Sequence, residues 1–587
     1  IGLTFLYTHT AEDTTTVATD TRGKRFFFGE DYDPYDTSHP GNQPDALATA
    51  PYIRTDTLEY NERTTGTLQL TGKHSLVDQK GWFGGPWEWG VPEVDWTVSS
   101  SFADMDQPDK RQFGAQWTPE VELIPGLTIP STWTPYKPAA NFNLGNFQRI
   151  WKTIEEDSVQ LSTNLRVPFK TTSDDRGYVK TGIFADRVDR QFTQESFSNF
   201  GDGGATYAAP WEEPWSAVFS EEDHPISASE YDVDYRGAID ISAWYAMVDY
   251  PFNAEWKAVG GARVEQTSIE VINEPEGLAL WYPNGTTAPV VLNPGDADVD
   301  IDQTDVLPSL GVEWQASKQW IFRGAVSGTL ARQTFKELTP ILQQEYLGGP
   351  IFIGNPELDT SSLVNFDLRA DWTPRDSTFV SASIFHKEVQ DAIEYVQRVG
   401  DFTYTTPVNY PKGHLTGLEL EARQKLGDMW KSMERFSVGG NATFIASEVA
   451  LPDDEAALFE QPNIQAPMPT RDMTNAPEHL YNLYITWDDE DLGTQVALFW
   501  TVQGDTLVAG AAEDDGNFVP NIYAKEYDTL NLSLSQQMGI LRWQLQVKNI
   551  TNPEIQEVYR SKYIGPDVPK SSYTKGIEYS LGFSLSF

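Results

Sequence analysis

The sequence predicts an all-β protein, a transmembrane antiparallel β-barrel, and the end of the chain carries the clearest evidence. From Ile577 to Phe587 every second residue is apolar, and the residues between them are polar or glycine. The preceding segment, 541–548, alternates in the same way. Strands of about ten residues with one apolar and one polar face are typical of a wall with lipid on one side and an aqueous lumen on the other.

The composition agrees with this fold class. The chain has 587 residues and a mean hydropathy of −0.44, and no segment approaches the roughly twenty apolar residues that a membrane helix needs. Aromatic residues make up 13%, which suits the aromatic belts at the two membrane interfaces. If the chain spans a membrane, it therefore crosses it as β-strands. One barrel over residues 1–587 is the expected domain organisation.

About eighteen amphipathic strands can be identified from the alternation of apolar and polar residues. In chain order they are 1–10, 56–76, 94–106, 146–169, 177–197, 235–251, 256–272, 304–316, 319–336, 361–374, 378–397, 402–425, 435–450, 474–488, 493–508, 525–538, 541–558 and 575–587.

The connections between these strands alternate between short and long. Turn-rich connections such as 171–176, 251–255 and 538–539 are short, whereas 11–55, 107–145 and 198–234 are long. Bacterial outer-membrane barrels have short periplasmic turns and long extracellular loops, so this alternation predicts the side of the membrane for each strand end. The exception is 77–93, a long, Trp-rich connection on the short side, for which an interfacial hairpin is the expectation.

Several classes of function receive no support. The chain has no Cys, its seven His are not spaced as metal ligands, and no phosphate-binding loop, dinucleotide fingerprint or nucleophile elbow is present. We therefore expect no enzyme activity, no cofactor and no metal site. The net charge of −44 also argues against nucleic acid as a partner.

From about residue 56 onward, the order of motifs resembles the carboxy-terminal barrel of TonB-dependent outer-membrane receptors. The most specific motifs are GNPELDTSSLVNFDL at 354–368 and PVNYPKGHLTGLELEAR at 407–423. Weaker matches, in order, are 58–76, 94–109, 259–271, 305–314, 322–340, 380–394 and 543–559. Arg332–Gln333 stands where the family usually has Arg-Pro, which leaves one loop entry uncertain.

The resemblance implies a barrel of about 22 strands preceded by a plug domain. Aligned by order, the chain would begin at the fifth strand, so the plug and the first strands are expected to lie outside this sequence. The implied location is the bacterial outer membrane, with lipid and lipopolysaccharide around the barrel. The implied function is active uptake of a scarce solute that binds the extracellular loops, with energy from TonB and the inner-membrane energising complex acting through the plug.

Two other functions are compatible with the sequence. If Ile1 were the mature start, the chain could be a passive, porin-like channel. It could also be a surface scaffold that docks partner proteins through its loops.

The candidate solute-binding residues are aromatic and acidic residues of the long connections. Between Asp202 and Asp234 the chain has nine carboxylates and no Lys or Arg, with two Trp among them. Trp faces beside carboxylates suit sugar stacking or cation recognition, although solvated loops with packed aromatics are the commoner explanation. The predicted contacts are Trp133, Trp211, Glu212, Glu213, Trp215, Trp281 and Tyr346, and Trp117, Tyr282 and Phe352 are further vestibule candidates. The negative loops favour a carbohydrate or polyphenol-like ligand over a ferric siderophore, because siderophore complexes are often anionic.

The series Asp296, Asp298, Asp300 and Asp302 imitates a calcium loop. It lacks the central Gly and the distal Glu of an EF-hand, so a polar strand entry is the preferred interpretation and no metal is predicted there.

Overall fold

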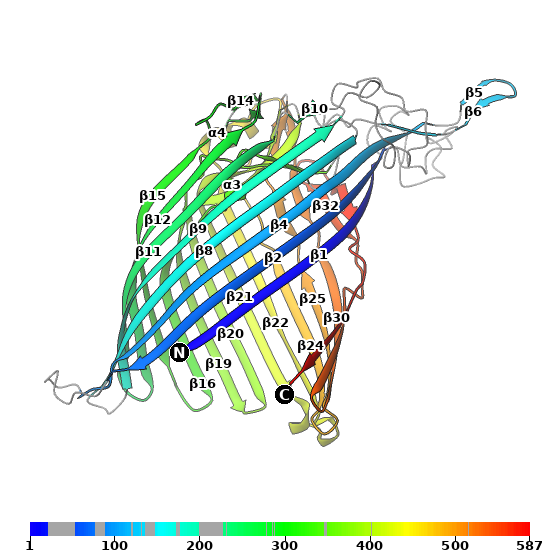
Figure 1. Ribbon diagram of the computed structural model, residues 1–587. Helices are drawn as coiled ribbons and strands as arrows, with labels where there is room; N and C mark the ends of the chain where they lie inside the picture. Colours follow the sequence, from blue (N-terminus) through cyan, green and yellow to red (C-terminus); the bar gives the residue numbers. More distant parts are fainter. Residues whose placement is uncertain are drawn as a thin grey trace.

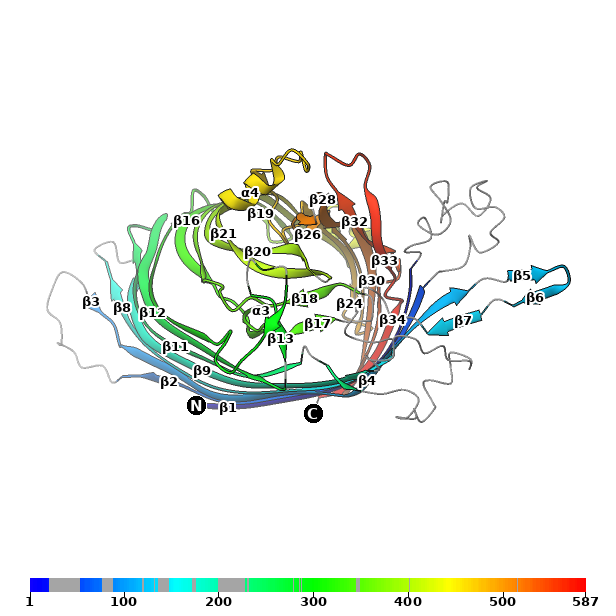
Figure 2. The same ribbon diagram turned by 90° about the horizontal axis from the view of Figure 1, so that it is seen from above.

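The main sheet of the computed structural model forms a tilted, curved wall (Figures 1 and 2). The structure describes residues 1–20, 53–76, 88–118, 121–130, 132–135, 147–171, 176–198, 227–229, 232–277, 279–283, 286, 288–344, 349–400, 402–514 and 516–586. In this part of the chain, the main sheet contains 24 strands, and four small sheets accompany it. No described helix is long and apolar enough to cross a membrane.

Eighteen strands of this sheet pair antiparallel in chain order, which confirms the predicted strands. They are β1 (Gly2–Asp20), β2 (Ile53–Ser75), β4 (Glu93–Thr118), β8 (Phe147–Lys170), β9 (Arg176–Ser198), β11 (Val233–Pro251), β12 (Trp256–Pro275), β15 (Val299–Trp314), β16 (Trp320–Ala331), β19 (Ser361–Arg375), β20 (Thr378–Val399), β21 (Thr403–Lys425), β22 (Phe436–Ala450), β24 (His479–Asp489), β25 (Thr494–Gln503), β30 (Tyr527–Met538), β31 (Leu541–Lys548) and β34 (Glu578–Leu585). No pairing joins β1 to β34 among the described residues. The further strands of a 22-strand barrel stay a prediction.

Several predicted strand ends need correction; the strands predicted over 493–508 and 541–558, for example, end at Gln503 and Lys548. β1 and β4 continue well past their predicted ends at residues 10 and 106, and both pair with β2 as far as Ile53, where β2 begins. The strand predicted over 319–336 instead ends at Ala331, and the short helix α3 (Phe335–Leu338) follows it. Thr334 caps this helix, with Glu337 completing a capping box, a local signal that ends the strand pattern.

The two faces of the wall differ in polarity, as the alternation predicts. On β24 the side chains of Leu483 and Ile485 are 50% and 38% exposed on the outer face. On the lumen face of the same strand, Asn482 donates a hydrogen bond from Nδ2 to Asn441 Oδ1 at 2.9 Å. The apolar face suits lipid, and the paired amides suit an aqueous interior.

An aromatic belt runs along the end of the wall where the connections are short, called here the turn end. Trp256 stacks on Trp314 at 5.2 Å, and Trp314 on Phe322 at 5.3 Å. Trp320 continues the row to Trp372 at 5.7 Å. Because amphipathic aromatic rings favour the membrane–water boundary, this row marks one membrane interface.

The Trp-rich exception at the turn end is partly described. Glu88 and Trp89 form β3 (Glu88–Trp89), which pairs with β8 beyond the start of β4. Trp89 packs edge-on against Phe169 at 5.8 Å. The segment therefore extends the line of β4 and adds to the interfacial aromatics, while residues 77–87 of the expected hairpin lie outside the described residues.

At the opposite end, called the loop end, one connection turns into the barrel. Its described residues are 332–344 and 349–360, called here the inner loop, and they include α3, β17 (Leu342–Gln344) and β18 (Ile351–Ile353). Seen from above, these elements lie inside the ring of strands (Figure 2). Phe335, Leu338 and Ile341 join a buried apolar cluster with residues of the wall, so the inner loop is packed against the wall.

The two most specific sequence motifs meet at the end of this inner loop. Asn355 donates a hydrogen bond from Nδ2 to the carbonyl of Pro407, and Asn409 bonds both the N–H and the carbonyl of Asp359. Gly354 is required because a Cβ there would collide with the carbonyl of Thr339. These contacts explain both motifs structurally, as anchors that hold the inner loop to β21.

Candidate functional site

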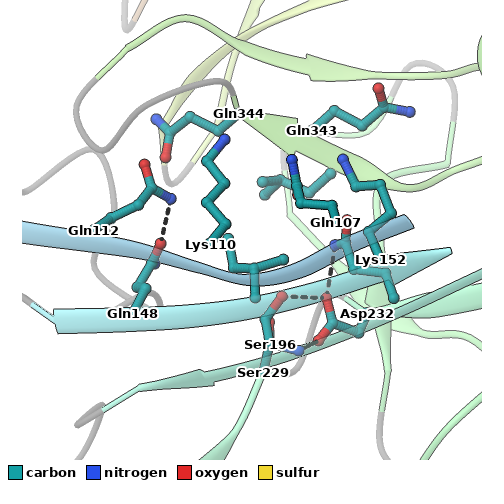
Figure 3. A pocket seen from close by; sticks show the side chains of 13 residues that line it. Gln107, Lys110, Gln112, Gln148, Lys152, Ser196, Ser229, Asp232, Gln343 and Gln344 are labelled. Carbon is teal, nitrogen blue, oxygen red and sulfur yellow. Dashed lines mark hydrogen bonds between the residues drawn. The ribbon is translucent and has the colours of Figure 1, made fainter. Parts of the chain in front are cut away.

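A polar pocket lies between the lumen face of β4, β8 and β9 and the β17 strand of the inner loop (Figure 3). It is small and partly open, with room for the centres of water-sized molecules over about 40 Å³. Its lining residues are Gln107, Lys110, Gln112, Gln148, Ile150, Lys152, Gln194, Ser196, Ser229, Asp232, Leu342, Gln343 and Gln344. Most of them are polar, and two are lysines.

A β-bulge in β4 places the first lining residues. Gln107 pairs with Lys152 and Lys110 pairs with Ile150, so two residues of β4 face one residue of β8 in between. Pro108 has no N–H to contribute to the ladder, and Asp109 adopts a φ of 58°, which Asp tolerates better than most residues. The extra residue shifts the alternation of β4 by one position, so Gln107 and Lys110 point to the same face of the strand. Both residues therefore line the pocket.

Asp109 holds the bulge from the side. Its carboxylate accepts hydrogen bonds from Arg149 Nε at 2.6 Å and from Arg111 Nε at 2.9 Å. Further bonds from the same two guanidinium groups complete the contact. Charge-assisted bonds of this kind are among the strongest in proteins, so the bulge is firmly fixed.

The two lysines differ in their pairing. Lys110 is 4% exposed and forms an ion pair with Glu59 at 3.1 Å. Lys152 is half-buried, and no described carboxylate lies within ion-pair distance of its amine. Both side chains rise from the strands toward the segment that carries Gln343 and Gln344 (Figure 3).

Lys152 lies beyond the membrane-spanning part of β8, because the outer face of this strand is polar and exposed at Asp157, Glu155 and Thr153. Burial is the main cause that lowers the pKa of Lys152 to about 8, and the positive charge of Lys110 lowers it further. Lys152 is therefore mostly protonated at neutral pH but loses its charge within the accessible range.

The glutamines form a hydrogen-bonded floor. Gln107 donates from Nε2 to Glu59 Oε1 at 2.8 Å and to Asn61 Oδ1 at 2.9 Å. Gln112 donates to Gln148 Oε1 at 3.0 Å. Gln107 is 3% exposed, yet its Oε1 atom has no hydrogen-bond partner among the described residues. A buried acceptor without a partner costs free energy unless something else binds it.

Asp232, the carboxylate that lines the pocket, is turned toward β9. It accepts hydrogen bonds from Gln194 Nε2 at 2.9 Å and from the Ser196 N–H and hydroxyl, the hydroxyl at 3.0 Å. Burial raises its pKa to about 6, against the lowering effect of these bonds. The carboxylate oxygens of Asp232 are therefore hydrogen-bonded to residues of β9.

The other side of the inner loop carries a smaller pocket. It is lined by Tyr282, Ile353, Gly354, Asn355, Arg398, Tyr404 and Thr406. Leu342 of β17 pairs with Ile353 of β18, so this hairpin separates the two pockets.

Most of the contact residues predicted from the sequence lie outside the described residues: Trp211, Glu212, Glu213, Trp215 and Tyr346. Trp133 lies in β7 (Thr132–Pro135), where its backbone pairs with that of Trp117, but neither side chain is described. Their role in binding stays a prediction.

Trp281 is described and lies away from the polar pocket. It belongs to β13 (Leu280–Trp281) and packs against the same buried apolar cluster as the inner loop. Its Nε1 is buried without a hydrogen-bond partner among the described residues. Tyr282 is buried beside Phe402 and Tyr404, and Phe352 lies under the Lys336 amine at 4.7 Å. These aromatics form loop core in the present structure.

The Asp series also has a structural role. Asp296 accepts hydrogen bonds from the backbone and side chain of Asn293, and Asp298 accepts one from the backbone of Asn273. No group of three or more potential metal ligands occurs within the described ranges.

Sequence reasoning missed the residues of the polar pocket. It placed the end of the strand at residue 106 and assigned Gln107 onward to a loop. The available signal was the alternation that resumes after Pro108 and Asp109, with Lys110 and Gln112 in phase with each other.

Comparisons with known proteins agree with this architecture. The family model described as TonB dependent receptor-like, beta-barrel matches residues 3–552. No curated protein sequence matches the chain. Among solved structures, the ferric-catecholate import receptor Fiu from E. coli K12 is 14% identical with a TM-score of 0.54, over 100% of this chain and 72% of that one.

Two further structures resemble the chain less closely. The ferric yersiniabactin uptake receptor FyuA from Yersinia pestis is 12% identical with a TM-score of 0.45, covering 91% of this chain and 71% of that one. The siderophore receptor PiuA from Acinetobacter baumannii is 11% identical with a TM-score of 0.46, covering 92% and 80%. At such identities, the likeness to Fiu concerns the fold alone. The family match, by contrast, spans nearly the whole chain, and the chain belongs to the TonB-dependent receptors, transport receptors of the bacterial outer membrane rather than enzymes.

Proposed function

We propose that this protein imports a scarce solute into the periplasm with energy delivered through TonB. The family match over residues 3–552 is the observation that carries the proposal. The solute enters from the loop end, meets the inner loop and the polar pocket, and passes on when the energised complex acts through a plug domain. The barrel wall performs no chemistry on the solute.

The inner loop favours this function over a passive channel. It lies within the ring of strands and is anchored to β21 by the hydrogen bonds of Asn355 and Asn409 (Figure 2). Free diffusion does not require a packed, multiply anchored segment inside the mouth of the pore. Selective capture benefits from one, because a rigid surface loses less conformational entropy when a solute binds.

For the solute we retain a hydroxyl-rich molecule, with carbohydrate as the first candidate. The acidic connection between β9 and β11 and its two Trp residues motivate this choice, together with the carboxamides of the pocket. None of the solved structures named above is described as a carbohydrate receptor, so the comparisons lend this choice no support.

The test is growth of three strains, the wild type, a receptor deletion and a TonB deletion, on a panel of oligosaccharides and ferric chelates. We expect the two deletions to lose growth on the same solute. A solute lost only in the receptor deletion would identify a passive channel. Normal growth of both deletions on every solute would favour a surface scaffold.

A further inference from the structure

The polar pocket differs in charge from the rest of this acidic protein. The whole chain carries a net charge of −44. The lining of the pocket, however, contains two amines, Lys110 and Lys152, and one carboxylate, Asp232, while the carboxylate of Glu59 lies beside Lys110. The two carboxylates are already engaged, Glu59 by Lys110 and Gln107, and Asp232 by β9. The pocket therefore presents positive charge to whatever enters it.

An amine with no paired carboxylate is costly to bury. Burial of a charged group disfavours its charged form unless an opposite charge or a hydrogen-bond acceptor compensates for the lost water. Lys110 has such compensation in Glu59, but Lys152 has none within ion-pair distance among the described residues. An anionic group placed in the pocket would supply it.

The pocket also contains an acceptor that an anion would not satisfy. Gln107 cannot easily turn its amide, because Nε2 is held by Glu59 and Asn61. Its Oε1 therefore stays directed away from these partners, buried and unbonded within the described structure. A hydroxyl group would donate to it, so the complementary ligand carries both an anion and a hydroxyl group.

We infer that this pocket binds an anionic, hydroxyl-bearing group of the imported solute, such as the hydroxycarboxylate of an acidic sugar. The carboxylate lies between the amines of Lys152 and Lys110, and a hydroxyl donates to Gln107 Oε1. Gln343 and Gln344 of the inner loop close the pocket from the lumen side. The inference rests on the proposed function, since it names a chemical feature of the solute.

The experiment measures binding to the receptor purified from outer membranes in detergent. The probe is trigalacturonate, and the matched neutral probe is maltotriose. Loss of one charge-assisted contact in a partly buried site predicts that Lys152→Gln weakens trigalacturonate binding about tenfold. Gln107→Leu, which removes the acceptor and the amide without changing charge, should weaken it several-fold.

The matched control is Lys180→Gln. This lysine lies on β9 toward the turn end, is half-buried and does not line the pocket. The substitution removes the same charge from the same wall, so its affinity for trigalacturonate should equal that of the wild type. Thermal melts of all three variants identify any variant that fails to fold.

Equal trigalacturonate affinity in Lys152→Gln and Lys180→Gln would overturn the inference, as would equal binding of maltotriose. Inorganic phosphate that binds as tightly as trigalacturonate would show a site for small free anions, which also contradicts it. These measurements need no energy source. Failure of TonB-dependent uptake would thus reject the proposed function. The binding measurements would still test the inference about the pocket independently.

Discussion

Two regions of the lumen wall differ in how their charged side chains are paired. Near the turn end, a row of side chains from β15 to β21 alternates in sign and is fully paired, and we call it the charge ladder. Its members are Glu313, Arg323, Asp371, Arg369, Glu421 and Arg423. In the polar pocket near the loop end, an amine and a carboxamide oxygen have no comparable partners among the described residues.

The difference separates structural charges from charges available to a ligand. Arginine suits the charge ladder because its planar group can bind two carboxylates at once, as Arg323 does with Glu313 and Asp371. Lysine suits the pocket because its amine can turn toward an incoming group. Pairing, more than the presence of charge, therefore indicates which part of the wall binds solute.

The largest effect on stability is expected when the most buried carboxylate of the charge ladder, Asp371, is removed. Asp371→Ala leaves Arg323 and Arg369 without their shared partner, and the loss of a largely buried pair predicts destabilisation of about 3 kcal/mol. Denaturant unfolding in detergent measures it, with the exposed Asp376→Ala as control. Binding of trigalacturonate to the folded fraction should not change, and a loss of binding would erase the distinction between the two regions.

A smaller effect is expected from the bulge that builds the pocket. Asp109→Ala removes the bonds to Arg149 and Arg111 and places a less tolerant residue at a φ of 58°, so stability should fall by about 2 kcal/mol. Asp109→Asn tolerates the same backbone conformation and should lose less. Trigalacturonate affinity should fall along with stability in the Ala variant. Unchanged affinity would show that the bulge does not position Lys110 and Gln107.

The smallest effect is expected for the pH dependence of trigalacturonate affinity. The pKa of Lys152 is lowered to about 8, so its positive charge is present below pH 8 and is lost as the pH rises through that value. Trigalacturonate affinity of the wild type should fall by up to about tenfold between pH 7 and 9.5, while that of Lys152→Gln stays nearly constant.

The ligand-free receptor should respond to pH in the opposite direction. Because the unfolded chain keeps Lys152 protonated up to about pH 10.4, it binds more protons than the folded chain between pH 8 and that value, and stability rises with pH there. Parallel rather than opposite trends would show that another group titrates. Lys110, Glu59, Asp232 and Lys336 are the groups to exchange next.

The strands could be predicted from the sequence because each depends on local alternation and on adjacent turns. The two-residue turn between Met538 and Leu541 and the alternation around Leu483 are sufficient without any distant contact. The two most specific family motifs coincide with the anchors of the inner loop, since Asn355 and Asn409 both bond backbone groups across that contact.

The pocket could not be predicted in the same way. A bulge reverses the facing of every residue after it, so alternation alone assigns Lys110 to the wrong face unless Pro108 and Asp109 are recognised as the insertion. Its far side comes from Gln343 and Gln344, which are distant in sequence. That juxtaposition depends on tertiary packing of the inner loop.

The order of pairing in the main sheet also has a consequence for how the chain assembles. Consecutive long strands pair with each other from β1 to β34, so the wall can grow by the addition of one hairpin at a time. Contacts between sequence neighbours form with little loop-closure entropy. The parallel pairing of Ile351 with Tyr404 is different, because it needs β21 to be in place before β18 can dock. We therefore expect the inner loop to close after its section of wall has formed, and the polar pocket to be among the last parts of the receptor to be completed.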